Sequence, residues 1–144
     1  KQLFRERGIV YHPARLRVRL EVNDIPYRIE LRHSYRFRSS INLSNQFLRC
    51  WELSDWEWDI ACHGHSHAGP FIVPFDRHGI RRWGCLSGAY KVIDPYAQQW
   101  GFNNAIPTSP AFVLDHQQRR ITGFDDLRTG LEVLKALRTT GGTV

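Results

Sequence analysis

Strict alternation of apolar and polar residues predicts a β-hairpin near the start of the chain. Leu or Val occupies every second position of residues 16–22, and Tyr, Ile and Leu alternate with charged residues over 27–32. A period of two is typical of a half-buried strand with one apolar face. Asn23-Asp24 between the two runs predicts the turn. The second strand would end next to His33 and so deliver a histidine to the edge of a sheet.

The remaining pattern predicts further strands and two helices. We expect, in order, a loop over 34–41, a helix over 43–53, a short strand over 59–62, a hairpin over 71–75 and 80–86, an irregular segment over 87–109, a hairpin over 111–115 and 119–124, and a helix after 125. Asn42 and Asp125 are the expected helix caps. This order favours an α+β or layered α/β domain over residues 16–138, with a lead-in at 1–15 and a frayed tail at 139–144.

Composition and charge narrow the class of protein. The chain has 144 residues, of which 42% are apolar, enough for the core of one domain. Its net charge is +6, and 17 of the 20 basic residues are arginine, which binds phosphate in a planar, two-pronged way. A nucleic-acid or nucleotide partner fits this charge, although a plain solvated Arg-rich surface explains it as well. No apolar run approaches the roughly 20 residues of a membrane span, so no membrane partner is expected.

Histidine and cysteine supply the candidate chemistry. His63, His65 and His67 alternate directly after the predicted strand 59–62, and neutral imidazole is the commonest protein ligand for zinc-, iron- or manganese-type ions. Gly64 lets the backbone approach an ion closely. We expect His65 and His67 to bind metal, with a chance cluster or an adventitious tract as the alternative. The three cysteines form no CxxC pair, which favours a reducing, cytoplasmic location.

These residues resemble the calcineurin-like metallophosphoesterases over about residues 16–125. The strand 59–62 leads through His63 into Gly64-His65-Ser66-His67, which is similar to the family's Gly-His-Thr-His motif, and the strand 27–32 ends in the single His33. The loop 34–45 looks like the family's Ser- and Asn-containing loop, and Trp83-Gly84-Cys85-Leu86-Ser87-Gly88 looks like its returning strand. The resemblance implies the C-terminal half of the family's β-sandwich, with strand hairpins and two helices.

The resemblance also implies a reaction and a set of ligands. Two divalent ions (Mn, Fe, Zn or Ni) would hydrolyse a phosphomonoester or phosphodiester, with His33 and His65 on one ion and His67 on the other. Gly64, His63 and Ser66 would support these ligands. The residues implied to line the substrate are Ser39, Ser40, Asn42, Ser87 and Gly88.

One departure from the family is large. The family's Asp-x-His, Gly-Asp and Gly-Asn-His motifs, which supply the bridging Asp and the leaving-group His, do not precede His33. The chain is therefore expected to need an N-terminal half or a partner chain, or else to have lost the activity. Alone, we expect it to be inactive and to expose a face that associates with other molecules.

A different class of protein fits part of the same pattern. Cys62, His65, His67 and Cys85 could instead hold a structural zinc in a small nucleic-acid-binding module, with the arginines on phosphates. A closed zinc site with thiolate ligands would distinguish this module from an open, histidine-only half-site.

Overall fold

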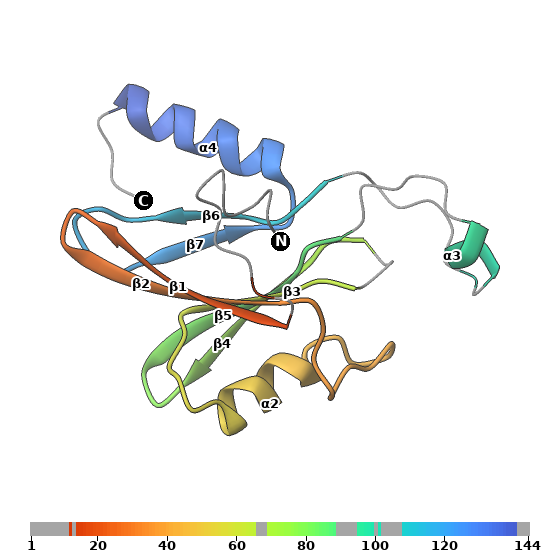
Figure 1. Ribbon diagram of the computed structural model, residues 1–144. Helices are drawn as coiled ribbons and strands as arrows, with labels where there is room; N and C mark the ends of the chain where they lie inside the picture. Colours follow the sequence, from red (N-terminus) through yellow and green to blue (C-terminus); the bar gives the residue numbers. More distant parts are fainter. Residues whose placement is uncertain are drawn as a thin grey trace, which may run out of the picture.

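A computed structural model describes residues 12, 14–65, 69–88, 95–99, 101 and 108–140. Its elements, shown in Figure 1, are β1 (Arg15–Val22), β2 (Ile25–Arg32), α2 (Asn45–Leu53), β3 (Ile60–His63), β4 (Phe71–Arg77), β5 (Ile80–Leu86), α3 (Pro95–Gln99), β6 (Ala111–Leu114), β7 (Ile121–Phe124) and α4 (Leu127–Thr140). The chain thus has a mixed α/β fold. No helix in the described part of the chain is long and apolar enough to cross a membrane.

The larger sheet has five strands in the order β1-β2-β3-β5-β4. Strands β2, β3 and β5 are parallel, and the two outer strands are antiparallel to their neighbours. β3 lies at the centre, as expected for a short strand with an apolar middle. Because the three inner strands are parallel, the segments that follow them emerge at one edge of the sheet.

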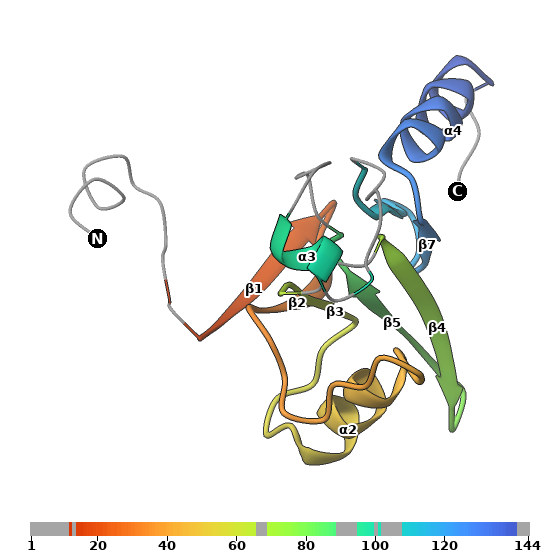
Figure 2. The same cartoon turned by 90° about the vertical axis from the view of Figure 1, so that its right-hand side faces the viewer.

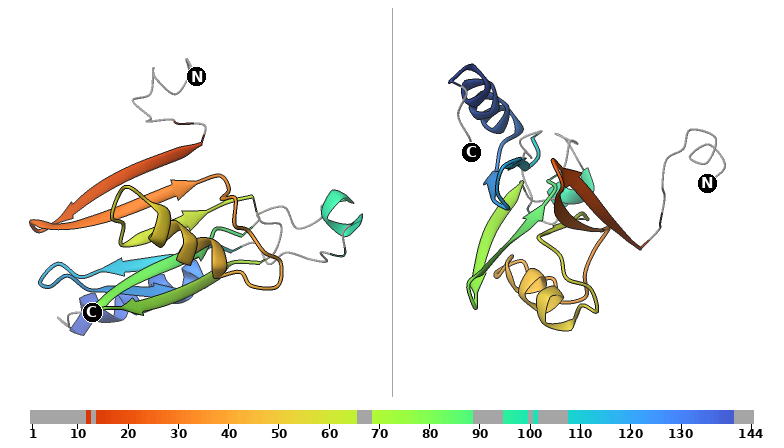
Figure 3. Two further views of the ribbon diagram at one scale, coloured as in Figure 1. Left: turned by 90° about the horizontal axis from the view of Figure 1, so that it is seen from below. Right: turned by 90° about the vertical axis from the view of Figure 1, so that its left-hand side faces the viewer.

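Helix α2 covers one face of this sheet, and the β6–β7 hairpin covers the other, with α4 on the outer side of the hairpin (Figures 1 and 2). On the helix side, a Cβ added at Gly84 would overlap the ring of Phe47, so glycine lets the two elements pack closely. On the hairpin side, the rings of Trp83 and Phe112 pack with centroids 6.1 Å apart. The Tyr27 hydroxyl also donates a hydrogen bond to the Asp115 carbonyl at 2.6 Å. The view from below in Figure 3 shows α2 lying across the sheet.

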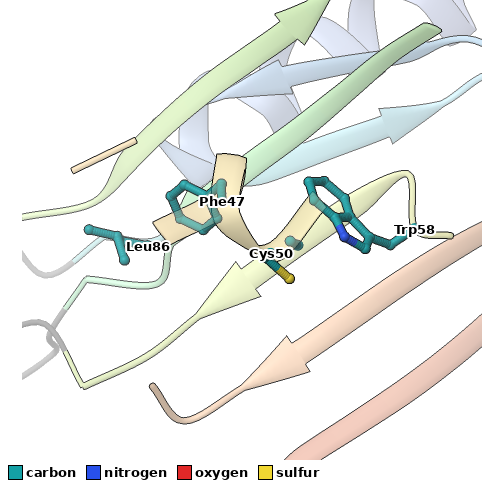
Figure 4. Packing of buried hydrophobic residues seen from close by; sticks show 5 residues of the cluster. Phe47, Cys50, Trp58 and Leu86 are labelled. Carbon is teal, nitrogen blue, oxygen red and sulfur yellow. The ribbon is translucent and has the colours of Figure 1, made fainter. Parts of the chain in front are cut away.

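The main apolar core lies between α2 and the sheet (Figure 4). Its buried members come from the helix, from the loop that follows it and from the two central strands; they are Phe47, Cys50, Trp58, Ala61 and Leu86. Burying such side chains is worth about 1.5–3 kcal/mol each for the larger ones. This core holds the helix against the central parallel strands.

The three predicted hairpins and the central strand are confirmed within one or two residues. In the first turn, Asn23 and Asp24 have φ angles of 50° and 66°. Residues of these types tolerate the left-handed region that tight hairpin turns require. The predicted turn at His78 and Gly79 has the same geometry, with φ of 52° and 74°.

The predicted starts of both helices were wrong, whereas the predicted end of the first helix at Leu53 is confirmed. Helix α2 begins at Asn45 after Ser44, and the Asn42 side chain accepts a hydrogen bond from the Ser44 hydroxyl instead of capping the helix. Asp126, not Asp125, caps α4, because its carboxylate accepts the Thr129 backbone N–H at 3.0 Å.

The predicted limits of the domain also need correction. The lead-in was drawn one residue too long, because β1 already begins at residue 15, and residues 1–11 and 13 lie outside the described part. Helix α4 continues to residue 140, so the predicted tail was wrong at 139 and 140, and residues 141–144 also lie outside the described part. The segment expected to be irregular contains the short helix α3.

Candidate metal-binding site at the carboxyl ends of the parallel strands

The carboxyl ends of β2, β3 and β5 lie side by side. Arg32 pairs with His63 in the parallel register, and the Gly64 N–H donates to the Arg32 carbonyl at 2.9 Å. On the other side of β3, the Ser87 N–H donates to the His63 carbonyl at 3.1 Å. Three strands therefore end at the same level, and the next residue or two of each segment line one edge. Such carboxyl edges are where open α/β sheets usually bind their ligands.

His33 and His65 meet at this edge. The Nε2 atom of His33 lies 2.9 Å from Nδ1 of His65, although the two residues are 32 positions apart. Their rings meet edge to face, with centroids 4.7 Å apart and an interplanar angle of 70°. Two nitrogens that bind one ion at about 2.0–2.1 Å each, at right angles, lie about 2.9 Å apart. The 2.9 Å contact is a hydrogen bond between the two rings, and the same distance would suit two ligands at right angles on one ion. Both side chains are exposed.

Gly64 makes this approach feasible. A Cβ added at Gly64 would lie 3.3 Å from the His33 carbonyl oxygen and 3.8 Å from the Ser87 hydroxyl. A side chain at position 64 would require a shift of a few tenths of an ångström. His65 itself has a φ of 61°, a left-handed conformation that non-glycine residues rarely adopt. Strained backbone of this kind concentrates at functional sites.

The side chain of His63 packs against helix α2. Its side chain is fully buried, its ring stacks on Phe47 with centroids 4.7 Å apart, and Nδ1 lies 2.9 Å from the Gln46 carbonyl oxygen. Because that oxygen is an acceptor, Nδ1 carries the hydrogen. Burial lowers the pKa of His63 to about 4, so its imidazole is neutral at physiological pH. His63 therefore joins α2 to the end of β3, a structural position.

The two remaining motif residues, Ser66 and His67, lie outside the described residues. Within the part that is described, no group of three His, Cys, Asp or Glu side chains is placed to hold an ion. This includes Cys62, His65 and Cys85, the three described members of the alternative zinc site. Cys62 and Cys85 are partners across β3 and β5, and both are free thiols.

The residues expected to line a substrate fall into two groups. Ser87 and Gly88 follow β5 directly, so they lie at the edge that carries the histidine pair. By contrast, the Ser39 hydroxyl accepts hydrogen bonds from the N–H groups of Ile41 and Asn42, at 3.2 and 3.0 Å. Ser39 and Asn42 therefore stabilise their own loop, and Ser40 between them is exposed.

The sequence analysis missed the residues that hold His63 in place. Gln46 is buried on α2, and the ring of Tyr35 lies 5.6 Å from that of His63. The only signal for Gln46 was that it is a polar residue in the predicted helix over 43–53. No pattern in the loop around Tyr35 pointed to this contact.

No protein-family model matches the chain, and no curated protein matches its sequence. The chemistry of this edge therefore has to be inferred from its own residues.

Proposed function

We propose that this chain supplies histidine ligands to the two-metal centre of a metallophosphoesterase, which hydrolyses a phosphomonoester or phosphodiester. The observation that supports this proposal is the 2.9 Å approach of His33 Nε2 and His65 Nδ1 at the carboxyl ends of parallel strands. The Gly64-His65-Ser66-His67 sequence that follows the central strand supports it as well.

The proposed ligand roles follow from this geometry and from the family resemblance. His33 and His65 would hold one divalent ion, and His67 would hold the other. Bound ions of this kind orient a phosphate group and lower the pKa of water from 15.7 towards about 7. Manganese, iron, zinc and nickel are all accepted by imidazole. The contribution of the described residues is positional, because the parallel register and Gly64 hold the two imidazoles at ligand spacing before an ion arrives.

The centre proposed here needs groups from another polypeptide segment. A bridging Asp and a leaving-group His, which the resemblance requires, do not precede His33. The histidine edge is open to solvent, and Leu31 beside it is 36% exposed. A covering segment or partner chain would complete the ligand set there. Without it, the isolated chain would bind one ion weakly and turn over little substrate.

Calorimetric titration with Mn²⁺ and Zn²⁺ tests the proposed half-site. We expect one site of modest affinity, weakened at least about tenfold by either His33→Ala or His65→Ala, in line with the cost of disturbing metal-site residues. His116→Ala is the matched control, because His116 is an exposed histidine in the β6–β7 turn, far along the chain from the pair.

Two results would contradict the proposal. One is metal binding that His33→Ala leaves unchanged. The other is tight zinc binding that is lost in Cys62→Ser and in Cys85→Ser, which would instead indicate the thiolate site of a nucleic-acid-binding module.

A further inference from the structure

A second candidate site lies at the other end of the parallel strands. A cavity of about 600 Å³ opens there, and five arginines line it: Arg28, Arg81, Arg82, Arg119 and Arg120. Its acidic lining residues are Glu57 and Asp59. Five positive charges against two negative ones leave the lining at +3. We refer to it below as the arginine cavity.

The arginine cavity is separate from the histidine pair. Asp59 lies directly before β3, whereas His63 ends that strand and His65 follows it. Four strand residues at about 3.3 Å each put roughly 13 Å between the two ends. The lining residues from β5 also come from its first half. A ligand in the cavity would therefore not contact the proposed metal ligands.

The carboxylates of the cavity do not neutralise it. Asp59 is 4% exposed, and its oxygens already accept the Arg28 backbone N–H at 2.7 Å and the Arg28 guanidinium at 3.4 Å. Arg119 also donates to Asp59 through one nitrogen. The Glu57 carboxylate accepts a hydrogen bond from Arg28 Nη1 at 2.7 Å. Outside the lining, Asp115 pairs with Arg120 and Asp76 pairs with Arg81. Arg119 and Arg120, which are 49% and 47% exposed, each pair with a carboxylate through one nitrogen and retain further N–H donors.

Arg82 is a buried arginine in the lining of the cavity. It is 4% exposed, its Nε is buried without a hydrogen-bond partner, and its nearest acidic atom is Glu57 Oε1 at 3.8 Å. Its guanidinium lies over the ring of Trp51 at 4.3 Å and over that of Trp58 at 5.4 Å. Burial lowers the pKa of this arginine. The two indole rings partly offset the burial of this cation, but its Nε has no acceptor, and an anion nearby would supply further compensation.

We propose that the arginine cavity binds a phosphate group, either as the free ion or as part of a nucleotide. Guanidinium forks match phosphate oxygens geometrically, and hydrogen bonds between charged partners are about twice as strong as neutral ones. The exposed Arg119 and Arg120 form the mouth and contact the incoming anion. Arg82, the buried member of the lining, contributes positive charge to the cavity. The cavity volume is within the usual range for small-molecule sites.

Calorimetry on protein kept metal-free with EDTA tests this site without the proposed metal centre. Inorganic phosphate and AMP are titrated separately into the wild type and into the double variant Arg119→Gln/Arg120→Gln. We expect the double variant to bind at least roughly tenfold more weakly, because hydrogen bonds to charged groups are worth about 1.5–3 kcal/mol. AMP binding more tightly than phosphate would identify a nucleotide as the ligand, and equal affinity would identify the free ion.

The matched control removes the same charge elsewhere. Arg49→Gln/Arg138→Gln neutralises two exposed arginines on α2 and α4 that do not line the cavity, and it should bind like the wild type. His33→Ala should also bind like the wild type, so failure of the metal proposal and failure of this one are distinguishable. Thermal unfolding of every variant, with and without phosphate, checks that each protein folds.

Two outcomes overturn the proposal. One is the absence of binding to the folded wild type at millimolar phosphate. The other is an equal loss in both double variants, which would show that only net charge attracts the anion.

Discussion

The two ends of the parallel strands β2, β3 and β5 differ in how their polar groups are used. At the amino ends, Asp59 is buried and receives hydrogen bonds from Arg28 and Arg119. At the carboxyl ends, the two histidines are exposed and only 2.9 Å apart. In the part of the chain that is described, no third metal-binding side chain joins them. The amino ends are fixed by charge pairs, and the carboxyl ends carry the exposed histidine pair that we propose as metal ligands.

The difference shows which end stabilises the fold. Removing a buried carboxylate leaves the charges of its arginine partners without compensation inside the protein. Removing an exposed imidazole leaves no buried charge unpaired. Stability should therefore depend mainly on the amino ends, and ligand binding by the histidines should depend on the carboxyl ends. Variants at each end separate these two roles.

The largest expected effect is that of Asp59→Ala. It leaves the Arg28 backbone N–H and the guanidinium groups of Arg28 and Arg119 without their acceptor. The cost is about 3 kcal/mol of unfolding free energy, the low end for a buried pair, because both guanidinium groups are partly exposed. His33→Ala should change stability by only about 0.5 kcal/mol, as exposed substitutions usually do. Urea unfolding at pH 7 measures both.

Asp76→Ala is the control for removing an acidic residue at the surface. Asp76 and Arg81 form an ion pair in which both side chains are 59% exposed. Breaking an exposed pair should cost about 0–1 kcal/mol. If His33→Ala destabilised the protein as much as Asp59→Ala, the contrast between the two ends would be wrong.

A second prediction concerns Glu30, the third residue from the carboxyl end of β2. Glu30 is fully buried, and although burial raises its pKa, hydrogen bonds from Arg32, Cys50 and Arg17 outweigh this and lower the pKa below its usual range. Glu30→Gln should cost about 2–3 kcal/mol at pH 7, less than a wholly buried pair because Arg17 and Arg32 keep some contact with water. Urea unfolding at neutral pH measures this loss.

The sign of its pH dependence follows from the lowered pKa. The stability that Glu30 contributes is complete above the pKa of the unfolded carboxyl, near 4.5, and is lost as the pH falls through the lower folded value. The gap between wild type and Glu30→Gln should therefore narrow below about pH 4.5. Glu132→Gln, on the exposed side of α4, should show no such gap at any pH. A gap that stayed constant down to pH 3 would mean that the charge of Glu30 is not what stabilises the fold.

The same residue shows where a sequence pattern stops being informative. Alternation correctly predicted both strands of the first hairpin, and Asn23 and Asp24 correctly predicted its turn. It did not reveal that the polar face of β2 is covered, because Glu30 looks like an ordinary surface glutamate. That face is buried by α2, whose Cys50 thiol lies 3.3 Å from a Glu30 oxygen. A binary pattern reports polarity, and burial depends on which element packs across the strand.

The two candidate sites were unequally predictable for a related reason. His33 and His65 each follow a predicted strand, so a parallel pairing of those strands is enough to bring them together. Arg82 follows another arginine in a strand and resembles surface charge. Its burial depends on Trp51 and Trp58, which come from α2 and from the loop after it. Contacts between distant elements of this kind leave no periodic trace in the sequence.

After Asp59→Ala and Glu30→Gln, a smaller change in stability is expected for His65→Gly. His65 has a φ of 61°, and the left-handed region costs an ordinary residue about 1–2 kcal/mol, whereas glycine enters it freely. Glycine also loses about 0.5–1 kcal/mol through its more flexible unfolded chain. His65→Gly should therefore gain about 0.5–1 kcal/mol of unfolding free energy while it weakens binding of Mn²⁺.

His78→Gly is the matched control, because His78 has a φ of 52° in the β4–β5 turn and should give the same gain without affecting the metal. Urea unfolding and metal titration of both variants would show whether the strained backbone of His65 lowers stability while it favours metal binding. A stabilised His78→Gly beside a destabilised His65→Gly would show instead that the contact between His65 and His33 outweighs the strain and supports the fold.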